Sequence, residues 1–327
     1  MNANSASPQA ALPQSALPQN GLRQSQSYSL ACNDAALEAQ FRDWIDGSRL
    51  EWPGHLELHL AVVDALPPRD DNRETLPQPG ILIQAGPPEG NVRIQWTTYG
   101  AEGIVHETRP EARMLMTRAA VENFEEGERG FLLVVLLFAL RRVGWYHIHG
   151  AALVDPIGRG WLLVGHAKSG KSTTSALLAR NGWSVTTDDI GFAGKSDEYV
   201  RLHGYFCPIG LREGGYALLG ASGGIDFARR GKMGFYPHDL GGSWIDTVQP
   251  EILLFPSVGE KTSIEPISPR DAMKALIDSS IWVLFETTHA QEHLEALSRL
   301  VKQSRCFRAT LGPDLFDNPA LLQELVS

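Results

Sequence analysis

Cysteine is scarce in this sequence of 327 residues: the chain has three, Cys32, Cys207 and Cys306, and they lie far apart. Disulfide frameworks and structural zinc sites both use cysteines at short, paired spacings, and this chain has none of those spacings. A few scattered cysteines are typical of proteins in a reducing compartment. The sequence therefore predicts a fold that is stabilised by its core rather than by cross-links.

Long hydrophobic runs are also absent. The longest runs from Phe131 to Leu140 and contains ten residues, whereas a helix needs about 20 apolar residues to cross a bilayer. The N-terminus lacks both the basic start and the apolar stretch of a secretory signal peptide. Together with the cysteine pattern, these absences predict a cytoplasmic location.

The sequence has no excess of positive charge. It holds 29 Lys and Arg against 38 Asp and Glu, which gives a formal net charge of −9. Nucleic acids and anionic membranes would both be repelled by such a chain, so we expect neither as a partner. The hydrophobic fraction of 43% is that of a globular protein, and the length is sufficient for two domains.

Against this background, one stretch carries a strong signal. From Trp161 to Thr173 the sequence is WLLVGHAKSGKST, which predicts a buried strand, a glycine-rich turn and the start of a helix. The spacing Gly165-x-x-x-x-Gly170-Lys171-Ser172 is that of a phosphate-binding P-loop. The glycines let successive backbone N–H groups converge on one point, and the helix N-terminus adds partial positive charge.

A P-loop in this context predicts a nucleoside triphosphate and Mg²⁺ as ligands. Lys171 would reach the β- and γ-phosphates, and the Ser172 hydroxyl would bind Mg²⁺. We predict that the phosphates of the nucleotide are bound by nine residues of the loop and the first helical turn: Gly165, His166, Ala167, Lys168, Ser169, Gly170, Lys171, Ser172 and Thr173.

Upstream of the P-loop we expect two regions. Residues 1–30 are rich in Gln, Ser, Pro and Ala and are predicted to be a disordered leader. Residues 31–128 are predicted to be a small α+β domain, which would serve either as a recognition domain or as a structural cap. Its expected elements are a helix over 35–45 and strands over 56–63, 81–83 and 92–96.

The second predicted domain spans residues 129–327 and contains the P-loop. It would open with an apolar helix over 130–144 that joins the two domains. The alternating segment 146–154 is predicted to be a strand that forms a hairpin with the P-loop strand. Glycine-rich residues 211–242 are expected to form long loops over the site. The remaining expected elements are strands over 251–255 and 306–311, and helices over 269–278, 289–302 and 319–326.

A pair of carboxylates follows the P-loop helix. The strand Trp183–Thr187 runs directly into Asp188 and Asp189. The strand–helix–strand order predicts a crossover that brings both aspartates to the sheet edge where the P-loop lies. An Asp-Asp pair after a strand can also be a simple turn or helix cap. Its distance from the P-loop favours a role at the phosphates.

These features together resemble the HPr kinase/phosphorylase C-terminal family, which shares its nucleotide fold with phosphoenolpyruvate carboxykinases. The matching residues are His149-Gly150, Gly165 to Ser172, and Gly182 followed by Asp188-Asp189. The resemblance implies an α/β fold with a P-loop nucleotide-binding sheet of the HPr kinase/phosphoenolpyruvate carboxykinase type, here preceded by the small α+β domain. It also implies assembly into a homo-oligomer.

The resemblance implies roles for four catalytic residues: His149, Lys171, Asp188 and Asp189. His149 would lie near the γ-phosphate. One aspartate would be the general base for an acceptor hydroxyl, and the other would help to bind the metal. We favour Asp189 as the base, which leaves Asp188 with Ser172 as the metal ligands.

The sequence thus predicts an ATP-dependent kinase that phosphorylates a hydroxyl. The resemblance implies that this hydroxyl belongs to a serine of a small protein or peptide. Relatives of this kind also tailor ribosomally made peptides, which is an alternative acceptor. True HPr kinases carry an Arg-Gly-Leu-Gly segment, whose nearest counterpart here is Leu211–Gly215. This departure favours a second hypothesis, an ATP-binding sensor that transfers no phosphate. A kinase of a small metabolite is a third.

Overall fold

The structure, a computed structural model, describes residues 23–24, 28–67, 76–78, 80–84, 90–194, 199–221, 224–227, 231–280 and 286–326. Its contacts divide the chain into two units. The first unit is Met1–Trp44 with Trp52–Val143, and the second is Ile45–Glu51 with Gly144–Ser327. Most of the predicted leader, residues 1–30, lies outside the described residues. Its last three residues form part of a buried strand instead, because Tyr28 and Leu30 face the core of the first unit.

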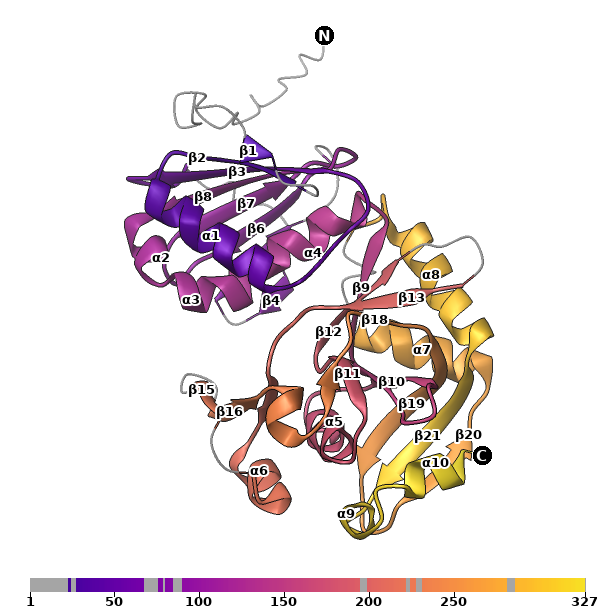
Figure 1. Ribbon diagram of the computed structural model, residues 1–327. Helices are drawn as coiled ribbons and strands as arrows, with labels where there is room; N and C mark the ends of the chain where they lie inside the picture. Colours follow the sequence, from indigo (N-terminus) through magenta and orange to yellow (C-terminus); the bar gives the residue numbers. More distant parts are fainter. Residues whose placement is uncertain are drawn as a thin grey trace. The chain divides into compact units, whose positions relative to one another are not determined.

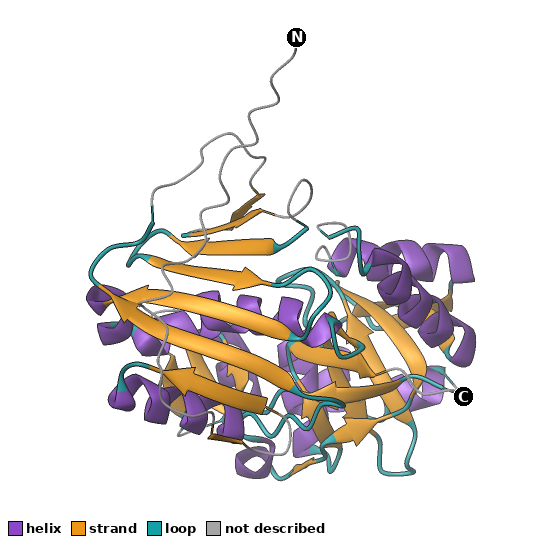
Figure 2. Ribbon diagram, turned by 90° about the horizontal axis from the view of Figure 1, so that it is seen from above, coloured by secondary structure: helices purple, strands orange, loops and turns teal. Residues whose placement is uncertain are grey.

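The first unit is built on one mixed sheet with helices over one of its faces (Figures 1 and 2). In spatial order the strands are β1 (Arg23–Gln24), β2 (Tyr28–Cys32), β3 (Leu56–Val63), β8 (Glu111–Thr117), β7 (Ala101–Val105), β6 (Val92–Trp96), β5 (Ile81–Gln84) and β4 (Leu76–Gln78). The helices are α1 (Ala35–Gly47), α2 (Arg118–Glu122), α3 (Phe124–Gly127) and α4 (Leu133–Arg141). The helix and the three strands predicted for this region are confirmed.

The apolar segment before the P-loop domain forms a π-helical turn over Glu128–Leu132 followed by α4, whose residues are all buried. Val135 packs so closely on β7 that a Cβ at Gly103 would lie 2.4 Å from its Cγ2 atom. Because α4 packs on strands of the first unit, the division between the units follows Val143. The predicted boundary at residues 128 and 129 differs from this division.

The second unit contains a ten-stranded mixed sheet. Its main path is β18 (Thr247–Val248), β13 (Arg201–Gly204), β12 (Ile190–Gly194), β9 (Trp145–Val154), β10 (Gly160–Val164), β19 (Pro250–Val258), β21 (Arg305–Leu311) and β20 (Ser263–Pro266), with β11 (Ser184–Thr187) on β9 and β17 (Ser243–Trp244) on β11. β9 and β10 are antiparallel, which confirms the predicted hairpin. β10, β19 and β21 are parallel, so their carboxyl ends share one edge.

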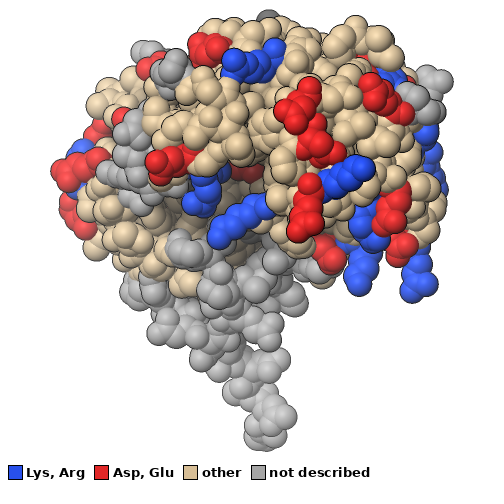
Figure 3. Space-filling view, turned by 90° about the horizontal axis from the view of Figure 1, so that it is seen from below, with Lys and Arg blue, Asp and Glu red and all other residues tan. Residues whose placement is uncertain are grey.

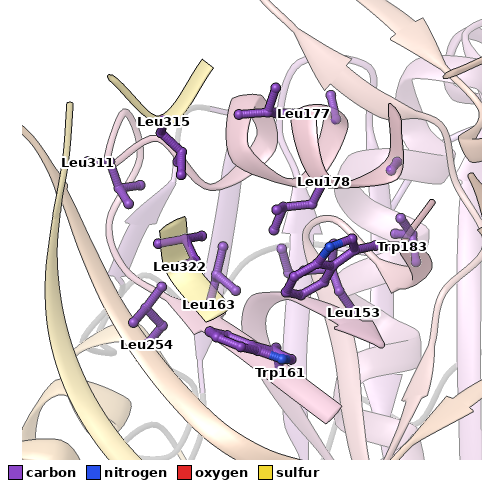
Figure 4. Close-up of a cluster of buried hydrophobic side chains, with 14 of the residues drawn as sticks. Leu153, Trp161, Leu163, Leu177, Leu178, Trp183, Leu254, Leu311, Leu315 and Leu322 are labelled. Carbon is purple, nitrogen blue, oxygen red and sulfur yellow. The ribbon is translucent and has the colours of Figure 1, made fainter. Parts of the chain in front are cut away.

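Helices cover both faces of this sheet. α5 (Lys171–Arg180), α9 (Asp314–Asp317) and α10 (Leu321–Leu325) pack on one core, and α7 (Pro269–Ser279) and α8 (Ala290–Gln303) pack on the other. Figure 4 shows the first core, in which Trp161 of β10 and Trp183, the residue before β11, lie below Leu178 of α5. Ser268 caps α7 by accepting a hydrogen bond from the Asp271 N–H at 3.1 Å, with Pro269 as the first helical residue, as predicted.

The expectation of long loops over residues 211–242 is wrong. This region contains α6 (Glu213–Leu219), a 3-10 turn η4 (Pro237–Leu240) and a small sheet of β14 (Ile209–Leu211), β16 (Lys232–Phe235) and β15 (Ile225–Phe227). Apolar residues between the glycines explain the difference, since Leu211, Leu219 and Phe235 are buried in the core under α5. Some of the glycines flank these elements, as Gly220 does after α6 with φ of 57°.

Candidate nucleotide and phosphoryl-transfer site

The predicted P-loop adopts a strand–turn–helix geometry. β10 is buried along its whole length, and α5 begins at Lys171 directly after the turn. Two residues of the turn have left-handed backbone conformations, Lys168 with φ of 68° and Gly170 with φ of 94°. Gly165 also lacks space for a side chain, because a Cβ there would lie 2.9 Å from the Ser169 Oγ. The loop is therefore curled tightly around the N-terminus of α5, as a phosphate-binding turn requires.

Lys171 is the buried cation of this loop. Its Nζ donates hydrogen bonds to the carbonyl oxygens of Gly165 and of His166, the latter at 3.1 Å. Burial lowers the pKa of Lys171, although the charges of Asp189 and Asp188 act in the opposite direction. The ammonium thus lies inside the turn and within the electrostatic reach of both carboxylates.

The two aspartates occupy a break between two strands that share one neighbour. β11 and β12 both pair with β9 on the same side, Thr187 with Ala152 and Ile190 with His149. The break is closed by the Thr187 hydroxyl, which donates to the Ile190 carbonyl at 2.7 Å and accepts from the Ile190 N–H at 3.1 Å. Because Asp188 and Asp189 lie outside the ladder, their side chains are free to form the site rather than the sheet.

The two sides of β9 bring this break to the P-loop. Val164, the last residue of β10, pairs with Gly150 of β9. On the other side of β9, the Gly150 N–H donates to the Asp189 carbonyl at 3.1 Å. The crossover from β10 through α5 to β11 therefore places the aspartates and the P-loop at one end of the same strand, which is the arrangement predicted from the order of elements.

Asp188 is buried against the helix that follows the P-loop. It accepts hydrogen bonds from the Ser172 side chain and from the Gly210 N–H, the latter 3.4 Å from its Oδ2. Its Oδ1 has no hydrogen-bond partner among the described residues. Burial raises the pKa of Asp188 to about 6, with a further contribution from the neighbouring charge of Asp189. A bound cation would stabilise the ionised form of such a carboxylate.

The pKa of Asp189 shifts in the opposite direction. Its Oδ1 lies 3.0 Å from His149 Nδ1, and half of its side-chain surface is exposed. Partial burial opposes its ionisation, but His149 and the charges of Lys232 and Lys171 outweigh that effect and lower the pKa of Asp189 to about 2. Asp189 is therefore a fixed anion at neutral pH, oriented by His149.

Lys232 is a residue of the site that the sequence does not predict. It is the first residue of β16, and its charge influences Asp188, Asp189 and Lys171. No spacing rule connects a lysine 61 positions after the P-loop lysine to that loop. Only the pairing of β16 with β14 brings the two together.

The donor set fits Mg²⁺ bound together with phosphates. Ser172 and Asp188 supply one hydroxyl and one carboxylate with an unpartnered oxygen. Mg²⁺ is usually held by one or two carboxylates, waters and substrate phosphates rather than by a full set of protein ligands. The described residues contain no group of three or more His, Cys, Asp or Glu side chains that could hold a metal ion.

The other residues predicted to bind the phosphates lie in different surroundings. His166, Ala167 and Lys168 are exposed at the tip of the turn. Thr173 contacts the start of α6, since a Cβ at Gly215 would lie 3.1 Å from its Oγ1. His149, Lys171, Ser172 and the two aspartates are brought together as described above. None of the helices in the described part of the chain has both the length and the apolar character needed to span a bilayer.

Comparisons with known proteins give matches among solved structures. No protein-family model matches the chain, and no curated protein matches it. Among solved structures, it is similar to the HPr(Ser) kinase/phosphatase from Coxiella burnetii, at 14% sequence identity and a TM-score of 0.29. That match covers 55% of this chain and 93% of the other. Such a distant likeness carries no functional argument.

Proposed function

We propose that this chain is an ATP-dependent kinase that transfers the γ-phosphate of ATP to a hydroxyl group, by preference the serine of a small protein or peptide. The observation that carries the proposal is the position of the Asp188 carboxylate. It accepts a hydrogen bond from the side chain of Ser172, the residue after the P-loop lysine, and it lies next to Asp189 in the break between β11 and β12. A simple nucleotide-binding turn does not need two carboxylates there.

In the proposed reaction the protein mainly neutralises charge and aligns the reactants, as phosphoryl transfer requires. The loop N–H groups and Lys171 would bind the β- and γ-phosphates. Ser172 and Asp188 would hold Mg²⁺, which when bound would neutralise charge on the phosphates. With Lys171 and the helix N-terminus, the positive charge would be concentrated where the transition state is most negative.

Asp189 would orient the acceptor. Its ionised carboxylate can accept a hydrogen bond from a serine hydroxyl, and His149 holds it in one position at 3.0 Å. As the hydroxyl oxygen attacks phosphorus, its proton would move to Asp189. We therefore keep Asp189 as the proposed base and Asp188 as the proposed metal ligand.

The first experiment measures nucleotide binding and transfer. We expect wild-type protein to bind MgATP and to transfer labelled phosphate to at least one member of a panel of small carrier proteins and precursor peptides. Lys171→Ala should abolish transfer and weaken ATP binding at least about 100-fold, because a charged hydrogen-bond donor to the phosphates is removed. The exposed Lys302 on α8 provides the control, and Lys302→Ala should behave as wild type. A Lys171→Ala variant with unchanged ATP binding would refute the nucleotide site.

A specific observation also favours a second function, an ATP-binding sensor that transfers no phosphate. A carboxylate with a pKa of about 2 is a weak proton acceptor. In a sensor, Asp189→Asn would leave ATP binding and the biological output intact, and wild type would bind ATP without turnover. In a kinase, Asp189→Asn should retain ATP binding and lose about 100-fold or more in transfer rate. The same pair of assays thus separates the two functions.

We propose that neither nucleic acid nor a membrane is a partner of this protein. The support is the net charge of −9 and the mixture of charges on the surface. On the face shown in Figure 3, Lys and Arg side chains lie among Asp and Glu side chains rather than in one continuous basic area. We also propose that the chain assembles into a homo-oligomer, which analytical ultracentrifugation would test directly.

A further inference from the structure

We propose that Lys232 is a second cation for the terminal phosphate, and that it makes the site prefer ATP over ADP. The inference rests on the proposed function, since it concerns the same nucleotide. It adds a residue to that proposal, because Lys232 comes from the small sheet and not from the P-loop.

The path of the Lys232 side chain carries the inference. β14 and β16 are antiparallel, and Gly210 of β14 pairs with Gly234, two residues after Lys232. The lysine side chain crosses Gly210, where a Cβ would lie 3.1 Å from Lys232 Cδ and 3.5 Å from Nζ. The Gly210 N–H in turn donates to Asp188 Oδ2. Glycine at position 210 thus lets the ammonium approach the buried aspartate across bare backbone.

The ammonium of Lys232 lies among the charges of the site. It is half-buried, and its charge acts on Asp188, Asp189 and Lys171. Within the described part of the chain, it forms no ion pair with a carboxylate. A half-buried lysine placed near two carboxylates but bonded to neither is suited to a third anionic group between them.

That group is best matched by the γ-phosphate. A P-loop holds the β-phosphate against the helix N-terminus, and the γ-phosphate lies farther out, beside the Mg²⁺ ligands. Asp188, which bonds Ser172, marks the Mg²⁺ side of this site. Lys232 lies along Gly210, whose N–H donates to Asp188, whereas Lys171 belongs to the P-loop itself. Two lysines from separate elements would therefore hold the terminal phosphate.

The test compares the affinities of each variant for MgATP and MgADP by calorimetry. Lys232→Met, which keeps the length but removes the charge, should weaken MgATP binding about tenfold or more and change MgADP binding less than about twofold. Lys232→Arg should keep the preference for ATP. Gly210→Ala, which leaves the charge but crowds the side chain, should reduce the preference to a smaller extent.

Lys302→Met is the matched control. Lys302 is exposed and lies just before β21, near the ends where β21 and β19 begin. The P-loop turn lies at the opposite ends of these two strands, beside Val258 and Leu311. The Lys302→Met variant should bind both nucleotides as wild type does. If wild type bound neither nucleotide, the proposed function itself would fail. If wild type bound both and Lys232→Met kept the ratio of the two affinities, the role of Lys232 alone would be refuted.

A structural role for Lys232 makes a different prediction. Lys232→Met would then weaken MgATP and MgADP equally and would lower the unfolding midpoint of the nucleotide-free protein. That combined result would also overturn the inference. An unchanged midpoint, with the loss confined to MgATP, would support it.

Discussion

Two adjacent carboxylates in this protein have opposite electrostatic surroundings. Asp188 is buried with one oxygen unpartnered, and the pKa of its carboxyl rises to about 6. Asp189 contacts His149 and lies near two lysines, which lower the pKa of its carboxyl to about 2. A pair of titratable groups with separated pKa values is a common property of catalytic sites. This separation agrees with the roles proposed above, metal binding for Asp188 and orientation of the acceptor for Asp189.

The burial of Asp188 predicts a conflict between stability and binding. At pH 8 its charge should destabilise the nucleotide-free protein, and Asp188→Asn should raise the free energy of unfolding by about 1 to 3 kcal/mol. The gain should shrink as the pH falls from about 6 toward 4, because the folded protein then binds the proton that the unfolded chain lacks. Urea unfolding between pH 4 and pH 8 measures this dependence.

The same variant should lose Mg²⁺-dependent ATP binding, because the proposed metal ligand is gone. Asp189→Asn is the control, since that side chain is half exposed and accepts from His149; it should give no gain in stability. A less stable Asp188→Asn protein at pH 8 would show that its carboxylate is stabilising in the folded state, against the direction of its pKa.

At the scale of elements, β9 organises the site. One strand pairs with β10 on one side and with β11 and β12 on the other, so it fixes the P-loop and the aspartates relative to each other. Gly150 lies at the crossing point, where a Cβ would lie 2.8 Å from the Leu163 carbonyl oxygen of β10. The glycine of the His149-Gly150 pair is therefore explained by close packing of backbones.

Replacement of this glycine tests that explanation. In Gly150→Ala the new methyl group would meet backbone that cannot turn away, so we expect a loss of about 1 to 3 kcal/mol in stability and weaker ATP binding. Thermal unfolding and calorimetry measure the two effects. Gly47→Ala is the control, because a Cβ at Gly47 would have nothing within 4 Å. Equal stability of the two variants would contradict the role assigned to β9.

At the scale of the whole molecule, buried histidines should make the fold sensitive to acid. Burial lowers the pKa of His147 to about 3 and that of His203 to about 4, both in the second unit. In the first unit, burial also lowers the pKa values of His59 and His106. His147 and His203 therefore stay neutral in the folded chain while the unfolded chain takes up protons near pH 6.5.

The stability that His147 and His203 contribute is therefore complete above about pH 6.5 and is lost as the pH falls toward their folded-state pKa values of about 3 and about 4. For His147 the loss at pH 5 should be about 2 kcal/mol, partly offset by the protonation of Asp188. His147→Phe should reduce the slope of stability against pH between 6.5 and 5, because the ring lies edge-on to Phe192 and its Nδ1 has no partner among the described residues. The exposed His238 is the control, and a slope unchanged in His147→Phe but altered in His238→Phe would contradict the prediction.

The sequence by itself determined the elements whose patterns are local. The P-loop, the hairpin before it and the cap at Ser268 follow from spacing, alternation and side-chain chemistry between near neighbours. These patterns are readable because successive strand residues point to opposite faces of a sheet and a helix start needs a hydrogen-bond acceptor, whatever the rest of the fold.

Only the tertiary structure decided the features that depend on residues far apart in the chain. Lys232 reaches the site because β16 pairs with β14, and the region 211–242 folds because Leu211, Leu219 and Phe235 are buried under α5. α4 belongs with the first unit because its apolar residues pack on that sheet. The P-loop was evident from a short motif, since its chemistry lies in consecutive backbone groups. The charges that face it were not, since burial and strand pairing set their positions and their pKa values.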